Sequence, residues 1–132
     1  MLAPSSRPLS PHLTIWRWGP HMLVSILHRI TGAGLAIVGG LALLWWLWAA
    51  ADGSGSYDYF VSWATHWTGI VVGVGLTWAF LQHLASGIRH LVMDVGAGFE
   101  LKTNKRWATI VAIVPALLTA LFWAYIFFGD QL

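Results

Sequence analysis

Three long apolar stretches divide the chain, and short polar segments separate them. The first covers about residues 22–50, the second 62–93 and the third 107–128. Each is at least as long as the roughly 20 residues that an α-helix needs to cross a bilayer. The pattern predicts an all-α membrane protein with three transmembrane helices, in a single membrane-anchor domain over residues 1–132. Residues 1–20 hold four of the five prolines and are predicted to form an irregular interfacial segment.

The polar segments between the apolar stretches are predicted to be loops. Residues 52–59 are rich in glycine and serine, and residues 99–106 carry Glu100, Lys102 and Lys105. Gly96 and Gly98 are expected to end the second helix. Composition supports a membrane protein, because only 9% of residues are charged and 58% are hydrophobic. The absence of cysteine excludes an iron–sulfur cluster and thiol catalysis, and leaves histidine as the main transition-metal ligand.

Basic residues predict the orientation of the helices. All seven Lys and Arg side chains lie before or early in the first span, or around the second loop. The charged residues of the first loop and the C-terminus are all acidic. The positive-inside rule therefore places the N-terminus inside and the C-terminus outside. A net charge of +2 is too small to indicate a nucleic-acid partner. No secretory signal or mitochondrial presequence is evident, so the bacterial cytoplasmic membrane is expected rather than the mitochondrial inner membrane.

Two polar stripes interrupt the apolar helices near this inner side. His83, Ser86, Gly87 and His90 fall at i, i+3, i+4 and i+7, which is one face of a helix. His83 lies about 16 Å inside the inner end of its helix at ~1.5 Å per residue. An ionisable group at that depth is costly and is a functional candidate.

The second stripe lies on the first helix. Ser25, His28, Arg29 and Gly32 repeat the same spacing, with His28 about 9 Å deep at ~1.5 Å per residue. The two helices run in opposite directions, so both stripes are expected at the same level.

The polar residues of the two stripes could serve the packing of the helices instead of binding a ligand. A lone intramembrane histidine such as His83 either donates to a backbone carbonyl of a neighbouring helix or ligates a metal. The small residues beside His83 and the arginine on the facing stripe favour a haem ligand, with His28 and Arg29 near the propionates. Arg89 is expected to pair with Asp94 at the interface.

The motifs together resemble a known family. Residues 7–13 (RPLSPHL), 25–32 (SILHRITG) and 83–94 (HLASGIRHLVMD) are similar in order and spacing to three signatures of the cytochrome b subunit of succinate dehydrogenase, the larger membrane anchor of respiratory complex II. The resemblance extends from Arg7 to about Glu100 and implies a bundle formed with a second anchor subunit.

The resemblance also implies residue roles. His83 matches the axial ligand of one haem b, whose second axial histidine comes from the small membrane-anchor subunit. His28 and Arg29 match contacts of the haem propionates, and Ser25 and Arg29 match the ubiquinone pocket. Asp94 matches an acidic residue of the third signature near the inner surface. Supporting roles are also expected of His90 and Arg89, which lie near the same boundary.

The sequence therefore predicts a membrane anchor of succinate:quinone oxidoreductase that is not a catalyst alone. Its expected partners are the small membrane-anchor subunit, the iron–sulfur subunit and the flavoprotein subunit, together with ubiquinone and membrane lipid. The alternative is a haem-free helical subunit for membrane assembly or transport. A transporter would be expected to show internal repeats or paired broken helices, and neither is visible.

Overall fold

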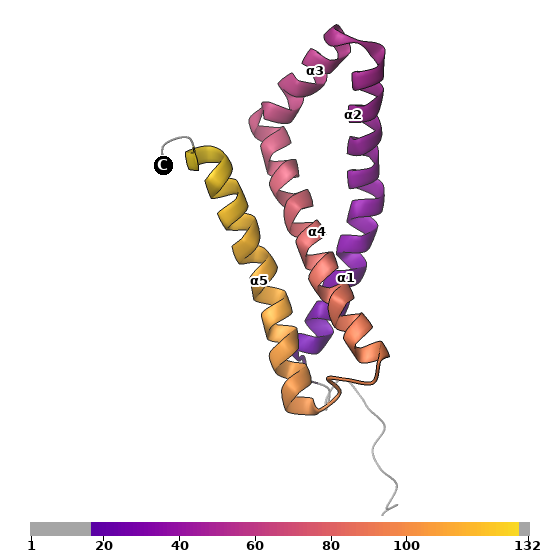
Figure 1. The fold of residues 1–132 in the computed structure, drawn as a ribbon, viewed down its shortest axis with the longest axis vertical. Helices are drawn as coiled ribbons and strands as arrows, with labels where there is room; N and C mark the ends of the chain where they lie inside the picture. Colours follow the sequence, from indigo (N-terminus) through magenta and orange to yellow (C-terminus); the bar gives the residue numbers. More distant parts are fainter. Residues whose placement is uncertain (1–16, 130–132) are drawn as a thin grey trace, which may run out of the picture.

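The computed structural model describes residues 17–129, and this part of the chain is helical with no β-strand (Figure 1). The helices are α1 (Pro20–Gly34), the π-helix η1 (Leu35–Gly39), α2 (Gly40–Asp52), α3 (Ser54–Thr65), α4 (Trp67–Asp94) and α5 (Leu101–Phe128). The motif at residues 7–13 and most of the predicted interfacial segment lie outside the described residues.

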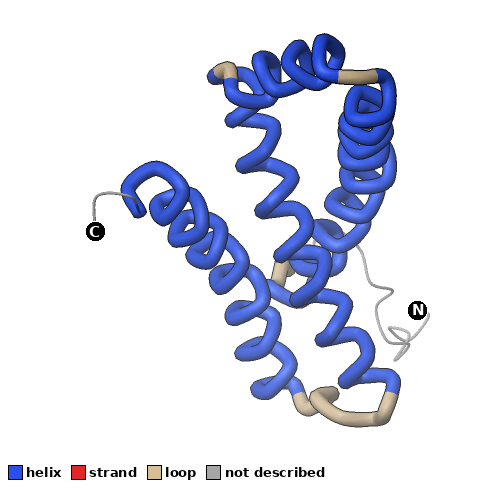
Figure 2. Tube along the Cα trace, turned by 45° about the horizontal axis from the view of Figure 1, so that its top comes forward, coloured by secondary structure: helices blue, strands red, loops and turns tan. Residues whose placement is uncertain are grey.

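Three helices are long and apolar enough to cross a membrane, which confirms the predicted fold class. They cover Pro20–Asp52, Trp67–Asp94 and Leu101–Phe128. The first consists of α1, η1 and α2 in one continuous helix, since the linking residues Gly34, Gly39 and Gly40 keep right-handed helical backbone angles. Loops are confined to the helix ends (Figure 2).

The helices pack together at one end of the molecule and separate towards the other. At the packed end α1, α4 and α5 contact one another around Val24, Ala108 and Val111. Towards the far end α5 diverges from α4, while α3 connects the separated ends of α2 and α4 (Figure 1). Small and β-branched side chains at the packed end allow the close approach of three helices.

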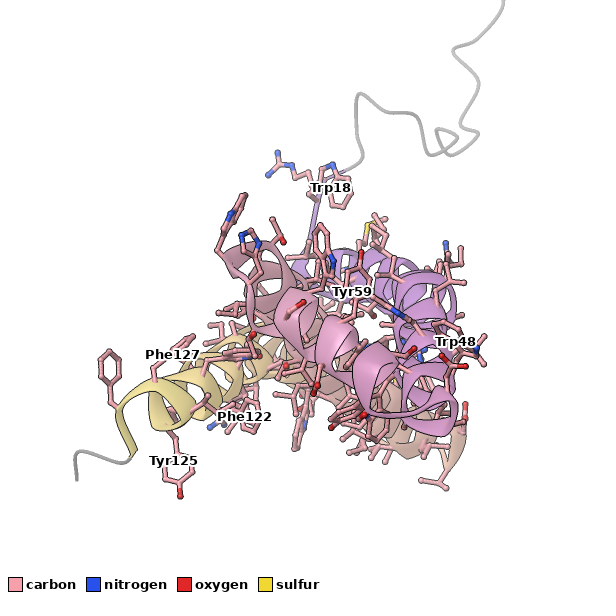
Figure 3. The ribbon with its side chains drawn as sticks, turned by 90° about the horizontal axis from the view of Figure 1, so that it is seen from above. Trp18, Trp48, Tyr59, Phe122, Tyr125 and Phe127 are labelled. Carbon is pink, nitrogen blue, oxygen red and sulfur yellow. The ribbon has the colours of Figure 1, made fainter. Side chains whose placement is uncertain are left out.

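Most large apolar side chains are exposed on the outer surfaces of these helices. Trp48 of α2 and Tyr125 of α5, for example, project away from the molecule (Figure 3). In water such surfaces would be unfavourable, so they are available to lipid or to partner helices.

The two predicted loops are shorter in the structure than in the sequence interpretation. Most of residues 52–59 belong to α2 or α3, because Trp45 of α2 packs edge-on against Tyr59 and Phe60. This tertiary contact outweighs the low helix propensity of glycine and serine. Gly53, with φ of 121°, makes the turn between the two helices.

The second loop is shorter because α5 begins at Leu101, before the apolar stretch that predicted it. Asn104 at its first turn is held by contacts to α4. The expected helix-ending turn is present, with Gly96 at φ 84°.

The corner between α3 and α4 leaves no room for a side chain at Gly69. A Cβ there would meet the carbonyl oxygen of Trp63 and lie 2.7 Å from that of Ala64. Because backbone atoms cannot move aside separately, Gly69→Ala is expected to open the corner and cost about 1–3 kcal/mol. The measurement is the thermal midpoint of the purified complex.

The control for this prediction is Gly75→Ala in the same helix, where a Cβ would meet nothing within 4 Å. Helix propensity alone predicts that this variant is neutral or slightly stabilising. Equal midpoints for the two variants would contradict the close packing inferred at the corner.

Candidate functional site

His83 of α4 points towards α1, where its ring is held from several sides. Its Nδ1 lies 3.1 Å from the backbone carbonyl oxygen of His28 and 3.4 Å from Thr31 Oγ1. The carbonyl can only accept a hydrogen bond, so His83 Nδ1 must carry the proton. In the neutral imidazole the remaining lone pair is then on Nε2, which leaves that atom able to ligate a metal.

The same contact matches the structural interpretation of His83, in which a neutral imidazole donates to a carbonyl of a neighbouring helix. That interpretation and metal ligation are compatible, because they use different ring nitrogens. A ligating histidine is usually oriented by a hydrogen bond from the ring nitrogen that does not bind the metal.

His28 stacks on His83 and is held by α4 in turn. The two ring centroids are 4.0 Å apart and the planes differ by 7°. His28 Nδ1 lies 2.7 Å from Ser86 Oγ, and Ser86 donates its own hydroxyl proton to the Gln82 carbonyl at 2.7 Å. Ser86 Oγ therefore accepts from His28, and His28 also carries its proton on Nδ1.

Two residues to which the sequence analysis assigned no role in the site complete this contact between helices. Thr31 is buried and donates to the Leu27 carbonyl at 2.7 Å, which leaves its oxygen beside His83. A Cβ at Gly32 would lie 2.9 Å from His83 Cε1, so only glycine lets the imidazole lie this close to α1. The sequence placed Gly32 on the polar stripe of the first helix, but its contact with His83 depends on the register between α1 and α4.

His90 lies beside this pair without joining the stack. Its ring centroid is 5.0 Å from that of His28, and the planes differ by 59°. His28, His83 and His90 are thus brought together from the two predicted stripes. The lone pairs of the two stacked rings lie in parallel planes, so His28 and His83 cannot converge on one bare ion. No group of three or more metal-ligating side chains suited to an ion occurs within residues 17–129.

The predicted pairing of Arg89 is wrong. Its guanidinium donates to Asn104 Oδ1 of α5 at 2.9 Å, whereas Asp94 is exposed at the end of α4. Arg89 is only 9% exposed and borders a cavity of about 110 Å³ between α4 and α5. The side chain turns into the helix packing because α5 begins early enough to offer Asn104.

Arg29 and Ser25 lie at the edge of this group. Arg29 is exposed and Ser25 is half-buried, and neither makes a hydrogen bond within the described part of the chain. Both remain on the α1 turns adjacent to His28. Their polar groups are therefore available to a ligand or a partner next to the histidines.

Ser86 is predicted to fix the tautomer and position of His28. Ser86→Ala removes the acceptor of the His28 Nδ1 proton, and leaving this partly buried donor without a partner costs about 1–3 kcal/mol. We expect a lower thermal midpoint of the purified complex. The control is Ser62→Ala on exposed α3, whose hydroxyl contacts only its own helix at the Tyr59 carbonyl. Equal losses in both variants would contradict the link between helices.

The family model and the relatives that match this chain carry consistent descriptions. The family model described as the succinate dehydrogenase/fumarate reductase transmembrane subunit matches residues 3–122. The succinate dehydrogenase cytochrome b556 subunit of Paracoccus denitrificans is 39% identical over 119 residues, which are 86% of this chain and 89% of that protein. The subunit of the same name from Rickettsia prowazekii is 36% identical over 120 residues, 90% of this chain and 92% of that protein. The mitochondrial cytochrome b560 subunit of Mus musculus is 35% identical over 113 residues, 83% of this chain and 64% of that protein.

Proposed function

The chain belongs to the succinate dehydrogenase/fumarate reductase transmembrane subunit family, and from this premise we propose that it binds one haem b with a partner subunit and forms part of a ubiquinone site. As a member of this family it is a multi-pass membrane subunit of the enzyme complex and is not catalytic alone. Its partners are the other subunits of that complex.

The observation that carries the haem proposal is the hydrogen bond between His83 Nδ1 and the His28 carbonyl. It reserves Nε2 for the iron and fixes the ring plane, while Gly32 leaves space for the ring. The name cytochrome b, carried by the relatives, implies the same prosthetic group. The second ligand of the haem would come from a partner subunit, which we propose is the small membrane-anchor subunit.

When bound, haem b supplies a one-electron redox centre within the membrane. The residues of this chain hold and surround it. His83 would hold the iron, and His28 and Arg29 would offer a hydrogen-bond donor and a positive charge to the propionates. His90, next to His28, would extend this polar surface. Arg89 would act indirectly by joining α4 to α5 through Asn104.

Ser25 and Arg29 are proposed to bind a quinone carbonyl, because their polar groups lie one turn or less from His28 on α1. Electrons would reach this site from an iron–sulfur subunit docked at the same end of the helices and reduced in turn by the flavoprotein subunit. This chain has no cysteine for a cluster of its own. Asp94, exposed at that end, is proposed to support the site or its proton supply.

The positions of the basic residues support an inward-facing site. Arg29 in the first third of the span Pro20–Asp52, Arg89 near the end of α4 and Lys102 at the start of α5 lie at the packed end of the helices. By the positive-inside rule this end faces the cytoplasm of a bacterial inner membrane. The N-terminus would then be inside and the C-terminus outside.

The proposed function is tested by the optical spectrum and subunit composition of the purified complex. A reducible b-type absorption in a preparation that contains all four subunits supports it. A complex that contains this chain with succinate dehydrogenase activity but no such absorption would identify a haem-free anchor. Purification without any of the other three subunits would favour the alternative of a separate assembly or transport protein.

The quinone assignment makes its own prediction. Arg29→Gln removes a charge-assisted hydrogen bond to the quinone carbonyl, worth about 1.5–3 kcal/mol. We expect at least a tenfold lower kcat/KM for ubiquinone, with unchanged succinate oxidation by an artificial acceptor that bypasses the membrane. Arg17→Gln, which removes an equal charge outside the membrane span, serves as the control. Equal ubiquinone kinetics in both variants would remove Arg29 from the site.

A further inference from the structure

Three basic side chains line a shallow groove on the first turns of α5. Lys102, Lys105 and Arg106 border it together with Thr109 and Ile110. The spacing i, i+3, i+4 and i+7 places the first four on one side of the helix, and all five are exposed. We define these five residues as the basic groove. The proposed haem and quinone sites use none of them.

The basic groove faces away from the other helices. Ala108, Val111 and Pro115 are buried on the side of α5 that packs against α1 and α4. At about 100° per residue, Arg106 lies about 160° around the helix from Ala108. Helix α5 therefore separates the basic groove from the histidines.

An apolar stripe continues from the basic groove into the membrane span. Ile110, Ile113 and Leu117 follow Arg106 on the same side, and their side chains are 40%, 52% and 57% exposed. The stripe from Ile110 to Leu117 is about 10 Å long at ~1.5 Å per residue. One leaflet of hydrocarbon is about 15 Å thick, so the stripe fits within it.

The nearby acidic residue does not neutralise the groove. The Glu100 carboxylate accepts a hydrogen bond from Thr103 Oγ1 at 3.1 Å. Glu100 also lies at least about 120° around the helix from each of the three cations. The three positive charges are therefore available to an anion.

We propose that the basic groove and the stripe below it bind an anionic phospholipid. The headgroup phosphate contacts Lys102, Lys105 and Arg106, and an acyl chain lies along Ile110, Ile113 and Leu117. Charge complementarity selects an anionic headgroup, and the continuous apolar stripe selects a lipid over a soluble anion. An acidic surface of a partner subunit would match the cations but would not occupy the stripe.

The test compares lipids retained by the purified complex, using native mass spectrometry after exchange into vesicles of phosphatidylglycerol and phosphatidylcholine. The triple variant Lys102→Gln, Lys105→Gln and Arg106→Gln is expected to retain phosphatidylglycerol roughly a hundredfold less well, because it loses three charges that attract an anionic headgroup. The matched control keeps the charges through Lys102→Arg, Lys105→Arg and Arg106→Lys, and should retain the lipid. Added inorganic phosphate should not displace it.

Three results would overturn the proposal. They are equal phosphatidylglycerol retention by the neutral and the charge-preserving variants, displacement by inorganic phosphate, and loss of the iron–sulfur subunit with lipid retention unchanged. If the neutral variant fails to assemble, the lipid proposal is tested on the unaltered complex instead. That complex must enrich phosphatidylglycerol over phosphatidylcholine and lose this preference at high salt. Haem absorption should be unchanged throughout, which separates this proposal from the proposed function.

Discussion

Replacing His83 with alanine or serine is expected to abolish the b-type reduced-minus-oxidised absorption of the purified complex. Either change removes the one imidazole within residues 17–129 that has both a free Nε2 and a ring plane fixed from the backbone. His28 should not replace it, although its ring lies only 4.0 Å away. The stack is parallel, and His28 is tied to Ser86, so its Nε2 cannot reach the position that His83 leaves.

The control for this prediction is His66→Ala. His66 lies between α3 and α4, is exposed, and bonds Thr68 at 2.9 Å. The His66→Ala change removes an imidazole from the far end of the molecule, so the spectrum should be unchanged. An unchanged spectrum in the His83 variants, with all subunits present, would show that the iron is ligated elsewhere. Partial recovery of the absorption on addition of free imidazole would confirm that the lost group was a ligand.

The second large effect is expected from Gly32→Ala. The new Cβ would lie 2.9 Å from His83 Cε1, closer than real Cβ contacts allow, and 3.3 Å from Nδ1, which is tighter than most such contacts. The His83 ring cannot tilt away without weakening its bond to the His28 carbonyl or its stack on His28. We expect a loss of about 1–3 kcal/mol from overpacking and a clearly reduced haem content, both measured on the purified complex.

Gly34→Ala is the matched control, because a Cβ at Gly34 would meet nothing within 4 Å. It lies two residues away in the same helix and changes helix propensity by the same amount. Haem content and thermal midpoint should therefore stay near those of the unaltered complex. If the two variants behave alike, contact between Gly32 and His83 does not position the ligand.

Much of the fold was predictable because the membrane imposes it. The three apolar stretches predicted three spanning helices, since a chain in lipid has few other ways to satisfy its backbone. The helical segment α3 was missed because its glycine and serine residues indicate a loop. Its stability depends on Trp45 packing against Tyr59 and Phe60, a contact between helices that no local pattern reveals.

The candidate site was predictable at the level of residues but not of contacts. Spacing and depth selected His83 and His28, because a helix has a fixed rise and an ionisable group in hydrocarbon is costly. The stacking of the two rings depends on the register between α1 and α4, which the sequence does not specify. The partner of Arg89 was mistaken for the same reason, since Asn104 reaches it from a third helix.

Because of the π-helix η1, the orientation of α2 relative to α1 depends on how many residues the first span contains as well as on which residues they are. A π-turn holds one more residue than the α-turn it replaces. A chain shortened by one residue between Leu35 and Gly39 would form a regular α-helix there, and α2 would be rotated by about 100° relative to α1. Trp45 would then point away from α3, although every side chain in both helices remained the same. Homologous chains can thus differ at this point by a single insertion or deletion that re-aims the far half of the span and leaves His28 where it is.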